Sequence, residues 1–286
     1  MGSSPIMRLS YTMKFLINSN PVTPGTRHFK YIKKNLLCKK NKLVKHLNFK
    51  IKQFVGRSAT TGHITVWGRG AGCKTLYRQI TCLNTTNFGI LLFSFYDPNR
   101  TGFVSLFFNL LTLKFSYRLA VKNTTAGSVL VTYKSTNTFK FRCGFRYPVY
   151  QQPVGSFICA ISLNSIKSPQ LALAGGTYCV ILRKNFLTGV CQIKMPSNQI
   201  LRISSLAFGT LGRLSNSYHK YTKKGKAGRN RLLGFRPSVR GIAMNPVDHP
   251  HGGRSNGGCE WVTPWGKSFR HLKTSRSKIQ KIFKAG

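Results

Sequence analysis

The sequence has almost no acidic residues. Asp97, Asp248 and Glu260 stand against 46 lysines and arginines, and the formal net charge is +43 over 286 residues. Catalysis by paired carboxylates is nearly excluded, because too few carboxylates exist to supply it. A compact monomer without a partner is also disfavoured, because repulsion among the cations opposes folding. Nucleic acid is the partner that this charge favours, since an anionic membrane usually attracts proteins through a short basic segment.

The sequence also lacks CxxC pairs and long uninterrupted apolar runs. Its eight cysteines therefore argue against a zinc ribbon. Cys159 and Cys179 lie in strand-like apolar runs, where we expect small buried hydrophobes in a reducing compartment. Polar residues break the most apolar region, 103–121, which favours paired strands over a membrane span. No secretory signal is visible; the acid-free first fifty residues resemble a transit peptide, although the whole chain is acid-poor.

What the sequence does contain is enough apolar material for a folded core, with 41% hydrophobic and 12% aromatic residues. Alternation and turn residues predict one block of strands at 63–67, 76–83, 89–96, 103–121 (two strands) and 128–132. A second block is predicted at 156–163, 177–182, 189–195 and 199–203, and a short helix at 275–283. Two blocks of short strands predict a mainly β protein, and the spacing in the first block suggests a small barrel.

The segment from Lys223 to Gly258 combines cations with glycine, proline and histidine. Glycines let the backbone approach phosphates, and prolines lower the entropy lost when an extended segment becomes ordered. Arginines bridge phosphates or stack on bases. A solvated basic linker is the plain alternative, but a linker does not need this mixture. We interpret residues 215–286 as an irregular RNA-binding extension that its partner orders.

Residues 234–253, GFRPSVRGIAMNPVDHPHGG, resemble the signature of the universal large-subunit ribosomal protein number two family. Other family motifs follow in family order over about residues 21–277: Pro24–His28, Tyr96–Arg100, Pro153–Gly155, Gln170–Ala172, Gly176–Tyr178, Gly225–Gly228 and Thr263–Gly266. The resemblance implies an OB-fold-like barrel at 56–135 and an SH3-like barrel at 150–210. A basic N-terminal arm, 1–55, and the C-terminal extension, 215–286, would flank them.

The resemblance also implies a function. Family members are structural constituents of the large ribosomal subunit that bind its rRNA near the peptidyl transferase centre. They support its assembly, subunit association and tRNA binding. The implied partners are large-subunit rRNA, neighbouring ribosomal proteins, the small subunit and, indirectly, tRNA. No enzyme activity is expected, because rRNA carries peptidyl transfer, and no cofactor is expected beyond Mg²⁺ associated with rRNA.

The sequence departs from the family at several points. Gly70–Lys74 reads GAGCK where the family has GGGHK, and Leu173 replaces an arginine. Arg254 and its neighbours replace an acidic residue common after the HPHGG segment. Together with the Phe- and Cys-rich composition, these departures suggest an organellar member, and we expect a mitochondrial location. A plastid and a bacterial cytoplasm are the alternatives.

Matching motifs and basic residues give the expected RNA contacts: Arg27, His28, Arg69, Lys74, Arg100, Lys223, Lys224, Lys226, Arg229, Arg231, Arg236, Arg240, Asn245, His249, His251, Arg254, Trp265, Lys273 and Arg276. Trp67 is expected in the core because it ends an alternating run. Trp261 and Trp265 are expected against RNA or a barrel surface, with base stacking as one mode of contact. Asp97 is expected to be a turn residue, and Glu260 a local partner for a nearby cation.

Asp248, His249 and His251 invite two sharper interpretations. An Asp beside an HxH could ligate a metal, but Pro250 restricts convergence of the rings and the nearby cations repel another cation. A general-base role has been attached to the family histidine that corresponds to His249. We instead expect His249 to contact RNA and to fix a loop. An enzyme would need a partner nucleophile or acid, which the sequence does not offer.

A free nucleic-acid packaging protein is the remaining rival. Such a protein would carry repeated basic motifs, whereas this sequence has one unrepeated signature of mixed composition. The ribosomal hypothesis therefore explains the sequence best.

Overall fold

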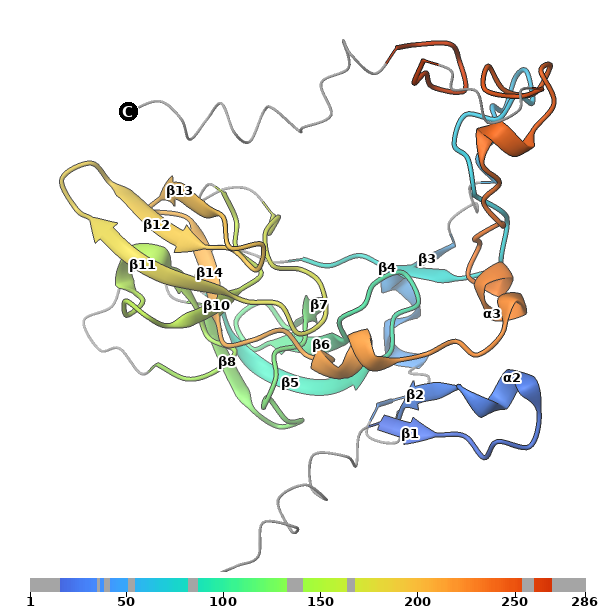
Figure 1. Ribbon diagram of the computed structural model, residues 1–286. Coiled ribbons are helices and arrows are strands. Elements are labelled where there is room, and N and C mark those ends of the chain that lie inside the picture. The colour runs from blue at the N-terminus through green and yellow to red at the C-terminus, as the bar shows by residue number, and fades with distance from the viewer. Residues whose placement is uncertain are drawn as a thin grey trace, which may run out of the picture. The chain divides into compact units, whose positions relative to one another are not determined.

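Ten short strands from the middle of the chain form one continuous sheet in the computed structural model (Figure 1). The structure describes residues 16–34, 37–38, 42–50, 55–81, 87–132, 141–163, 168–253 and 260–268. The chain divides into two compact units. Residues 1–52 and 74–227 make the first, here called the sheet unit, and residues 53–73 and 228–286 make the second, the loop unit.

The strands of the large sheet follow the order β13-β12-β11-β10-β14-β9-β8-β5-β6-β7. Their bounds are β5 (Asn87–Phe95), β6 (Val104–Asn109), β7 (Lys114–Leu119), β8 (Val129–Thr132), β9 (Arg146–Pro148), β10 (Phe157–Cys159), β11 (Cys179–Asn185), β12 (Val190–Lys194), β13 (Ile200–Ser204) and β14 (Phe208–Leu211). All pairings are antiparallel except β8 with β9, which meet in parallel at the single pair Thr132–Arg146. The sheet thus has two antiparallel halves. The prediction of a mainly β protein is confirmed, and the halves are consistent with two barrels.

The first half, β5 to β8, packs its core around aromatic rings. Phe95 and Tyr117 are almost fully buried and meet edge to face, with ring centroids 6.1 Å apart. Val44 and, from β6, Val104 and Leu106 belong to the same buried cluster. Burying one such side chain is worth roughly 1.5–3 kcal/mol, so these strands hold together through their inward faces.

The second half, β9 to β14, is lined by aliphatic side chains and cysteines. Ile158, Ile181 and Ile193 are fully buried, as are Cys159 and Cys179. The prediction that these cysteines are small buried hydrophobes is confirmed. Burial raises the pKa of the Cys179 thiol to about 11, which keeps it protonated and unreactive at neutral pH.

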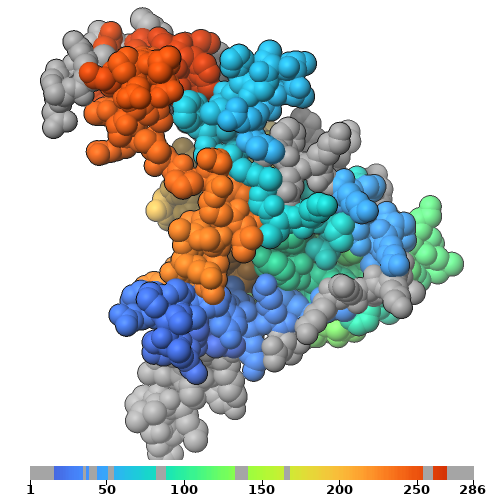
Figure 2. Space-filling model, turned by 90° about the vertical axis from the view of Figure 1, so that its right-hand side faces the viewer, coloured from blue at the N-terminus to red at the C-terminus, as the bar shows by residue number. Residues whose placement is uncertain are grey.

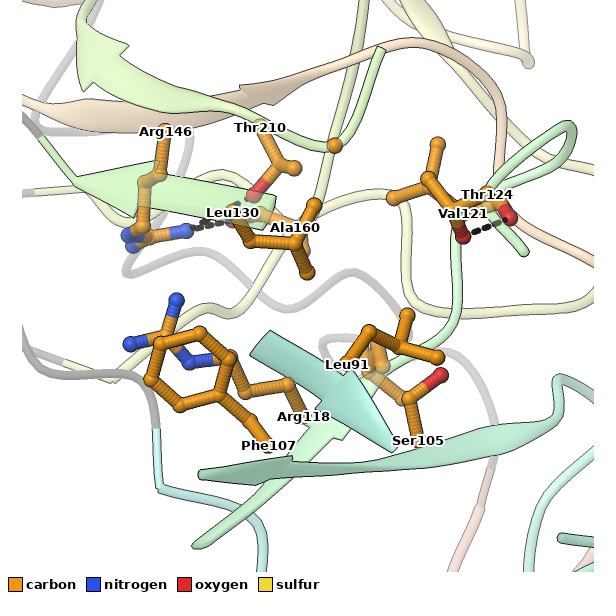
Figure 3. A pocket seen from close by; sticks show the side chains of 12 residues that line it. Leu91, Ser105, Phe107, Arg118, Val121, Thr124, Leu130, Arg146, Ala160 and Thr210 are labelled. Carbon is orange, nitrogen blue, oxygen red and sulfur yellow. Dashed lines mark hydrogen bonds between the residues drawn. The ribbon is translucent and has the colours of Figure 1, made fainter. Parts of the chain in front are cut away.

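Two arginines face a small cavity inside the sheet unit (Figure 3). Arg146 is 3% exposed, and its Nη1 donates to the carbonyl of Ala160 at 2.8 Å. The Arg118 guanidinium lies 3.6 Å from the ring centroid of Phe107. The cavity measures about 30 Å³, room for about two waters. A buried cation is tolerated when its N–H groups make hydrogen bonds, and here those bonds link neighbouring segments of the sheet unit.

The N-terminal arm is more structured than the sequence predicted. β1 (Leu16–Asn18) and β2 (Lys30–Ile32) form a hairpin around the helical turn α2 (Pro24–Arg27). The 3-10 turn η2 (Lys42–Leu47) leads into β3 (Asn48–Lys50), which pairs with β4 (Leu76–Arg78). The backbone of Lys30 exchanges two hydrogen bonds with Lys223, of 3.1 and 3.0 Å. Figure 2 shows the hairpin, in dark blue, against the orange chain that follows the 3-10 turn η4 (Ser217–Tyr221).

The loop unit contains turns and two short helical segments, α3 (Ala227–Leu232), which begins at the last residue of the sheet unit, and η5 (Gly241–Ala243). The strand predicted at 63–67 is wrong, because the chain there forms turns and a single bridge between Arg57 and Ile64. Residues 56–73, predicted as part of the first barrel, group with the C-terminal segment instead. Trp67 was expected in the core and is 42% exposed, so that prediction is also wrong.

The other predicted strands are present, although β4 and β10 are shorter than expected. The helix predicted at 275–283 lies outside the described residues. Among the residues that the structure describes, no helix is both long and apolar enough to cross a membrane.

Candidate nucleic-acid interface

Two glycine-containing loops clamp together at the centre of the loop unit. The N–H of Gly70 donates to the carbonyl of Gly234 at 2.8 Å, and the N–H of Cys73 donates to that of Leu232 at 2.8 Å. Gly72 has φ +66°, and a Cβ there would stand 2.7 Å from the nitrogen of Gly234. Only glycine fits such a close backbone approach with positive φ. Residues 68–73 and 232–236, here called the glycine clamp, are therefore fixed by backbone contacts.

Three arginines cluster at the glycine clamp: Arg69 and Arg236 lie within it, and Arg231 directly precedes its second segment. A Cβ on Gly70 would lie 3.2 Å from Cγ of Arg236 and 3.6 Å from Nη1 of Arg231. The Arg69 guanidinium lies 5.0 Å from the ring centroid of Phe235. No ion pair to Arg69, Arg231 or Arg236 occurs within the described ranges. Adjacent cations without a carboxylate repel one another, and phosphates relieve that repulsion while releasing counterions. The arginine cluster is therefore suited to a polyanion.

A second basic surface belongs to the sheet unit. Lys223 is held beside Lys30 through the backbone, and the Lys226 side chain lies along α2, with Cδ 3.4 Å from the position of a Cβ on Gly25. Arg27 ends α2 and is exposed. The structure thus brings together basic residues that are far apart in the sequence. They belong to the predicted RNA contacts Arg27, His28, Lys223, Lys224 and Lys226.

The HPHGG segment folds into a closed loop. The N–H groups of Asp248 and His249 donate to the carbonyl of Asn245 at 3.0 and 3.2 Å, and that of Gly253 donates to Met244 at 3.1 Å. A Cβ on Gly252 would collide with the Asn245 carbonyl. These contacts explain why glycines follow the histidines in this loop, since a side chain at Gly252 would force the loop open.

Both histidines support this loop from inside. His249 is 8% exposed, and its Nδ1 accepts the N–H of His251 at 3.0 Å. Nε2 of His251 lies 3.0 Å from the carbonyl oxygen of Glu260 and 3.1 Å from the backbone nitrogen of Val262. Among the described residues, no group of three His, Cys, Asp or Glu side chains could hold a metal. The geometry gives His249 the loop-fixing role that the sequence suggested, and it gives His251 the same role, which the sequence did not suggest.

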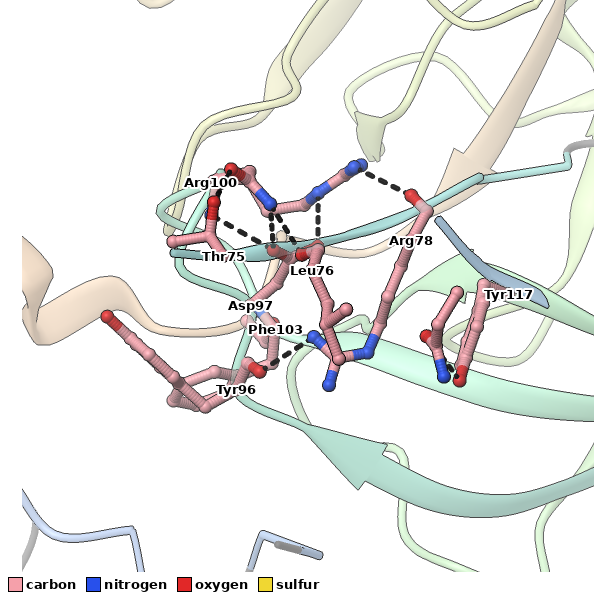
Figure 4. Close-up of polar contacts among 11 residues, drawn as sticks. Thr75, Leu76, Arg78, Tyr96, Asp97, Arg100, Phe103 and Tyr117 are labelled. Atoms are coloured by element: carbon pink, nitrogen blue, oxygen red, sulfur yellow. Dashed lines mark hydrogen bonds and ion pairs between the residues drawn. The ribbon is translucent and has the colours of Figure 1, made fainter. Parts of the chain in front are cut away.

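Arg100 is engaged inside the sheet unit (Figure 4). Its Nε lies 2.9 Å from Oδ2 of the fully buried Asp97, and its Nη2 donates to the carbonyl of Arg78 at 3.0 Å. Asp97 Oδ1 accepts the N–H of Asn99 at 2.9 Å, as expected of a turn residue. Arg100 retains 20% side-chain exposure, so its first task is to anchor this turn, and its RNA contact stays a prediction.

The remaining predicted contacts are dispersed. Lys74, Arg240, Asn245 and Trp265 are exposed, and Arg229 is half-buried. Trp261 is also exposed, at 77%. Arg254, Lys273 and Arg276 lie outside the described residues. Arg57 was not predicted; its Nη1 donates to the carbonyl of Gly62 at 2.9 Å, beside the exposed Trp67. Interpreting this stretch as turns would have placed both side chains at the surface.

Comparison with known proteins points to one family. Residues 142–270 match the family model described as Ribosomal Proteins L2, C-terminal domain. Large ribosomal subunit protein uL2 of Orientia tsutsugamushi (strain Ikeda) is 40% identical over 275 residues, covering 92% of this chain and 96% of that protein. Large ribosomal subunit protein uL2m of Reclinomonas americana is 39% identical over 269 residues, covering 92% and 94%. The uL2 protein of Hyphomonas neptunium (strain ATCC 15444) is 36% identical over 266 residues, covering 91% and 93%.

The similarity spans both antiparallel halves of the sheet and the loop unit, so it does not rest on the HPHGG segment alone. The chain belongs to the uL2 family of large ribosomal subunit proteins.

Proposed function

We propose that the protein is a structural constituent of the large ribosomal subunit that binds its rRNA near the peptidyl transferase centre. The observation that carries this proposal is the arginine cluster, three guanidiniums presented on a rigid glycine clamp without an acidic partner in the described ranges. Rigid cations fix register on an RNA backbone, so the protein reads shape rather than sequence. In this role it supports subunit assembly, contact with the small subunit and tRNA binding.

The site residues act as RNA contacts and not as catalysts. The hydrogen bond of His249 favours this assignment, because its Nδ1 already accepts the N–H of His251 and is not available to abstract a proton. Peptidyl transfer is left to rRNA, and neither a cofactor nor a protein-held metal is needed; Mg²⁺ is associated with the rRNA. We assign the protein to the mitochondrion. The departures at Gly70–Lys74 and Leu173 support this assignment, and the relatives include both bacterial and mitochondrial proteins.

Sedimentation tests this function directly. The tagged full-length protein should co-migrate with large ribosomal subunits of purified mitochondria after a high-salt wash. A packaging protein held by charge alone would dissociate, because its affinity falls steeply with salt. Recovery of the protein only in free fractions, or only outside mitochondria, would contradict the corresponding part of the proposal.

Replacing His249 by alanine should impair function by displacing the loop. The change removes the acceptor for the His251 N–H and the ring that packs on Gly241. We expect a loss of about 1–3 kcal/mol in loop stability, typical of an unsatisfied buried donor. Chemical probing should show altered rRNA around the protein, while the pH profile of peptide-bond formation stays unchanged.

Asp248→Asn is the matched control, because this exposed side chain lies in the same loop next to His249 and its change removes a carboxylate. It should assemble normally. The catalytic alternative would gain if the His249 variant left the RNA structure unchanged while peptide-bond formation collapsed with a shifted pH profile.

A further inference from the structure

A cavity of about 460 Å³ opens in the loop unit beside Trp67. Its size falls within the range of roughly 300–1,000 Å³ that is typical of small-ligand pockets. Much of its wall is apolar and open to solvent: Trp67 is 42% exposed, Val66 52% and Val239 57%. Large apolar side chains gathered at a concave site mark a place where something binds.

The same cavity is also lined by three arginines. Arg57, Arg69 and Arg236 all line it, and no acidic residue is found among the described lining residues. Each guanidinium has five N–H donors, so the bond from Arg57 to Gly62 and the contact of Arg69 with Phe235 leave donors available. The preferred occupant is therefore flat and apolar at its centre and negatively charged at its flanks. A free phosphate would not need the apolar wall, and an apolar peptide would not need three arginines.

The backbone on both sides of Trp67 is held in place. The N–H groups of Thr65 and Val66 donate to the carbonyl of Gly56 at 2.8 and 3.1 Å. Gly56 has φ +76°, and a Cβ there would collide with the Val66 carbonyl. On the other side, the Gly68 carbonyl accepts the N–H of Arg236 at 3.0 Å. A platform that is already ordered loses little entropy when a ligand stacks on it.

His249 adds a polar group to the wall. Because Nδ1 accepts the His251 N–H, the neutral ring carries its proton on Nε2. Within the described ranges, Nε2 of His249 has no hydrogen-bond partner in the protein. It is therefore a donor that an acceptor on a ligand could use.

We propose that this cavity binds one unpaired nucleobase of rRNA, with the Trp67 indole as stacking platform and Arg57, Arg69 and Arg236 on the flanking phosphates. His249 Nε2 donates to an acceptor on the base edge. RNA-binding proteins commonly take splayed-out bases onto aromatic rings in this manner. The inference rests on the proposed function, and it adds a specific nucleotide contact to a surface otherwise suited to shape.

Two RNA hairpins that differ at a single position provide the test. One carries a bulged adenosine there and the other an abasic nucleotide, so both have the same number of phosphates. The full-length protein should bind the bulged hairpin about tenfold more tightly at about 0.15 M salt, the effect of one base–aromatic stack. Trp67→Ala should abolish this preference, Trp67→Phe should restore most of it, and Phe186→Ala, at an exposed aromatic of the sheet unit, should leave it intact.

The outcomes separate the two proposals. Equal affinity of the native protein for both hairpins would overturn the base pocket and favour a protein side chain as its occupant, while RNA binding itself would stand. Failure to bind either hairpin would overturn the pocket together with the proposed function. A preference that survives in Trp67→Ala would place the base elsewhere and would also refute the assignment.

Discussion

Replacing Gly72 by alanine is expected to lower the affinity of the protein for large-subunit rRNA by roughly tenfold or more, about 1.4 kcal/mol or above. Alanine at φ +66° costs about 1–2 kcal/mol before any contact is considered. Its Cβ would also stand 2.7 Å from the Gly234 nitrogen and 2.8 Å from the Leu232 carbonyl oxygen, both backbone atoms. The glycine clamp must open, and the arginine cluster then loses its fixed geometry.

Gly62→Ala is the control for the Gly72 variant. Gly62 lies in the same unit with φ +68°, but a Cβ there would meet nothing within 4 Å. This variant bears the backbone strain without opening the clamp, so its RNA affinity should stay within about twofold of the native value. Filter binding of the full-length variants on an rRNA fragment would measure the affinity, and circular dichroism of the same proteins would check that the β-sheet stays folded. Equal losses for both variants would mean that the clamp does not organise the interface.

Changing Arg69, Arg231 and Arg236 together to glutamine should flatten the salt dependence of RNA binding. Each lost phosphate contact reduces the slope of log K against log salt by about 0.7–0.9, so three contacts predict a change of about 2 to 3. The affinity at low salt should fall most, because the released counterions drive binding there. Glutamine removes the charge and leaves a shorter polar side chain, and the clamp itself is held by backbone bonds.

A matched triple variant changes Lys122, Arg183 and Lys194 to glutamine. These side chains are exposed on the sheet unit and none is a predicted RNA contact. The net charge falls by the same amount, so this variant separates local contacts from overall charge. If both triple variants shifted the slope equally, the arginine cluster would have no special role in binding.

Much of the sheet could be predicted from the sequence. β5 to β8 have long apolar runs with turn residues between them, such as Asp97 before Arg100, and local signals of this kind decide strand positions. β9 and β14 were missed because Arg146–Pro148 and Phe208–Leu211 are too short to show alternation. Their positions are fixed by pairing with each other, and a tertiary contact of this kind leaves no local pattern.

The site was predictable in composition but not in arrangement. The basic residues could be named because charge is visible in a sequence, and the HPHGG glycines because backbone approach requires them. The prediction for Trp67 was wrong because residues 63–67 alternate as a strand would. In the structure, the N–H groups of Thr65 and Val66 bond to the Gly56 carbonyl, and the segment forms turns instead. Arg100 was taken only as an RNA contact, although an aspartate three residues before it already signalled an internal ion pair.

The loop unit is assembled from pieces that the ribosome synthesises at very different times. Residues 53–73 emerge early, but their clamp partner at 232–236 follows about 160 residues later. Domains that are complete fold during synthesis, so the sheet unit has its material first, and the arginine cluster takes shape only when translation is nearly finished. A newly made chain therefore lacks the arginine cluster until the sheet unit has been synthesised, and a product cut before Gly228 never acquires it.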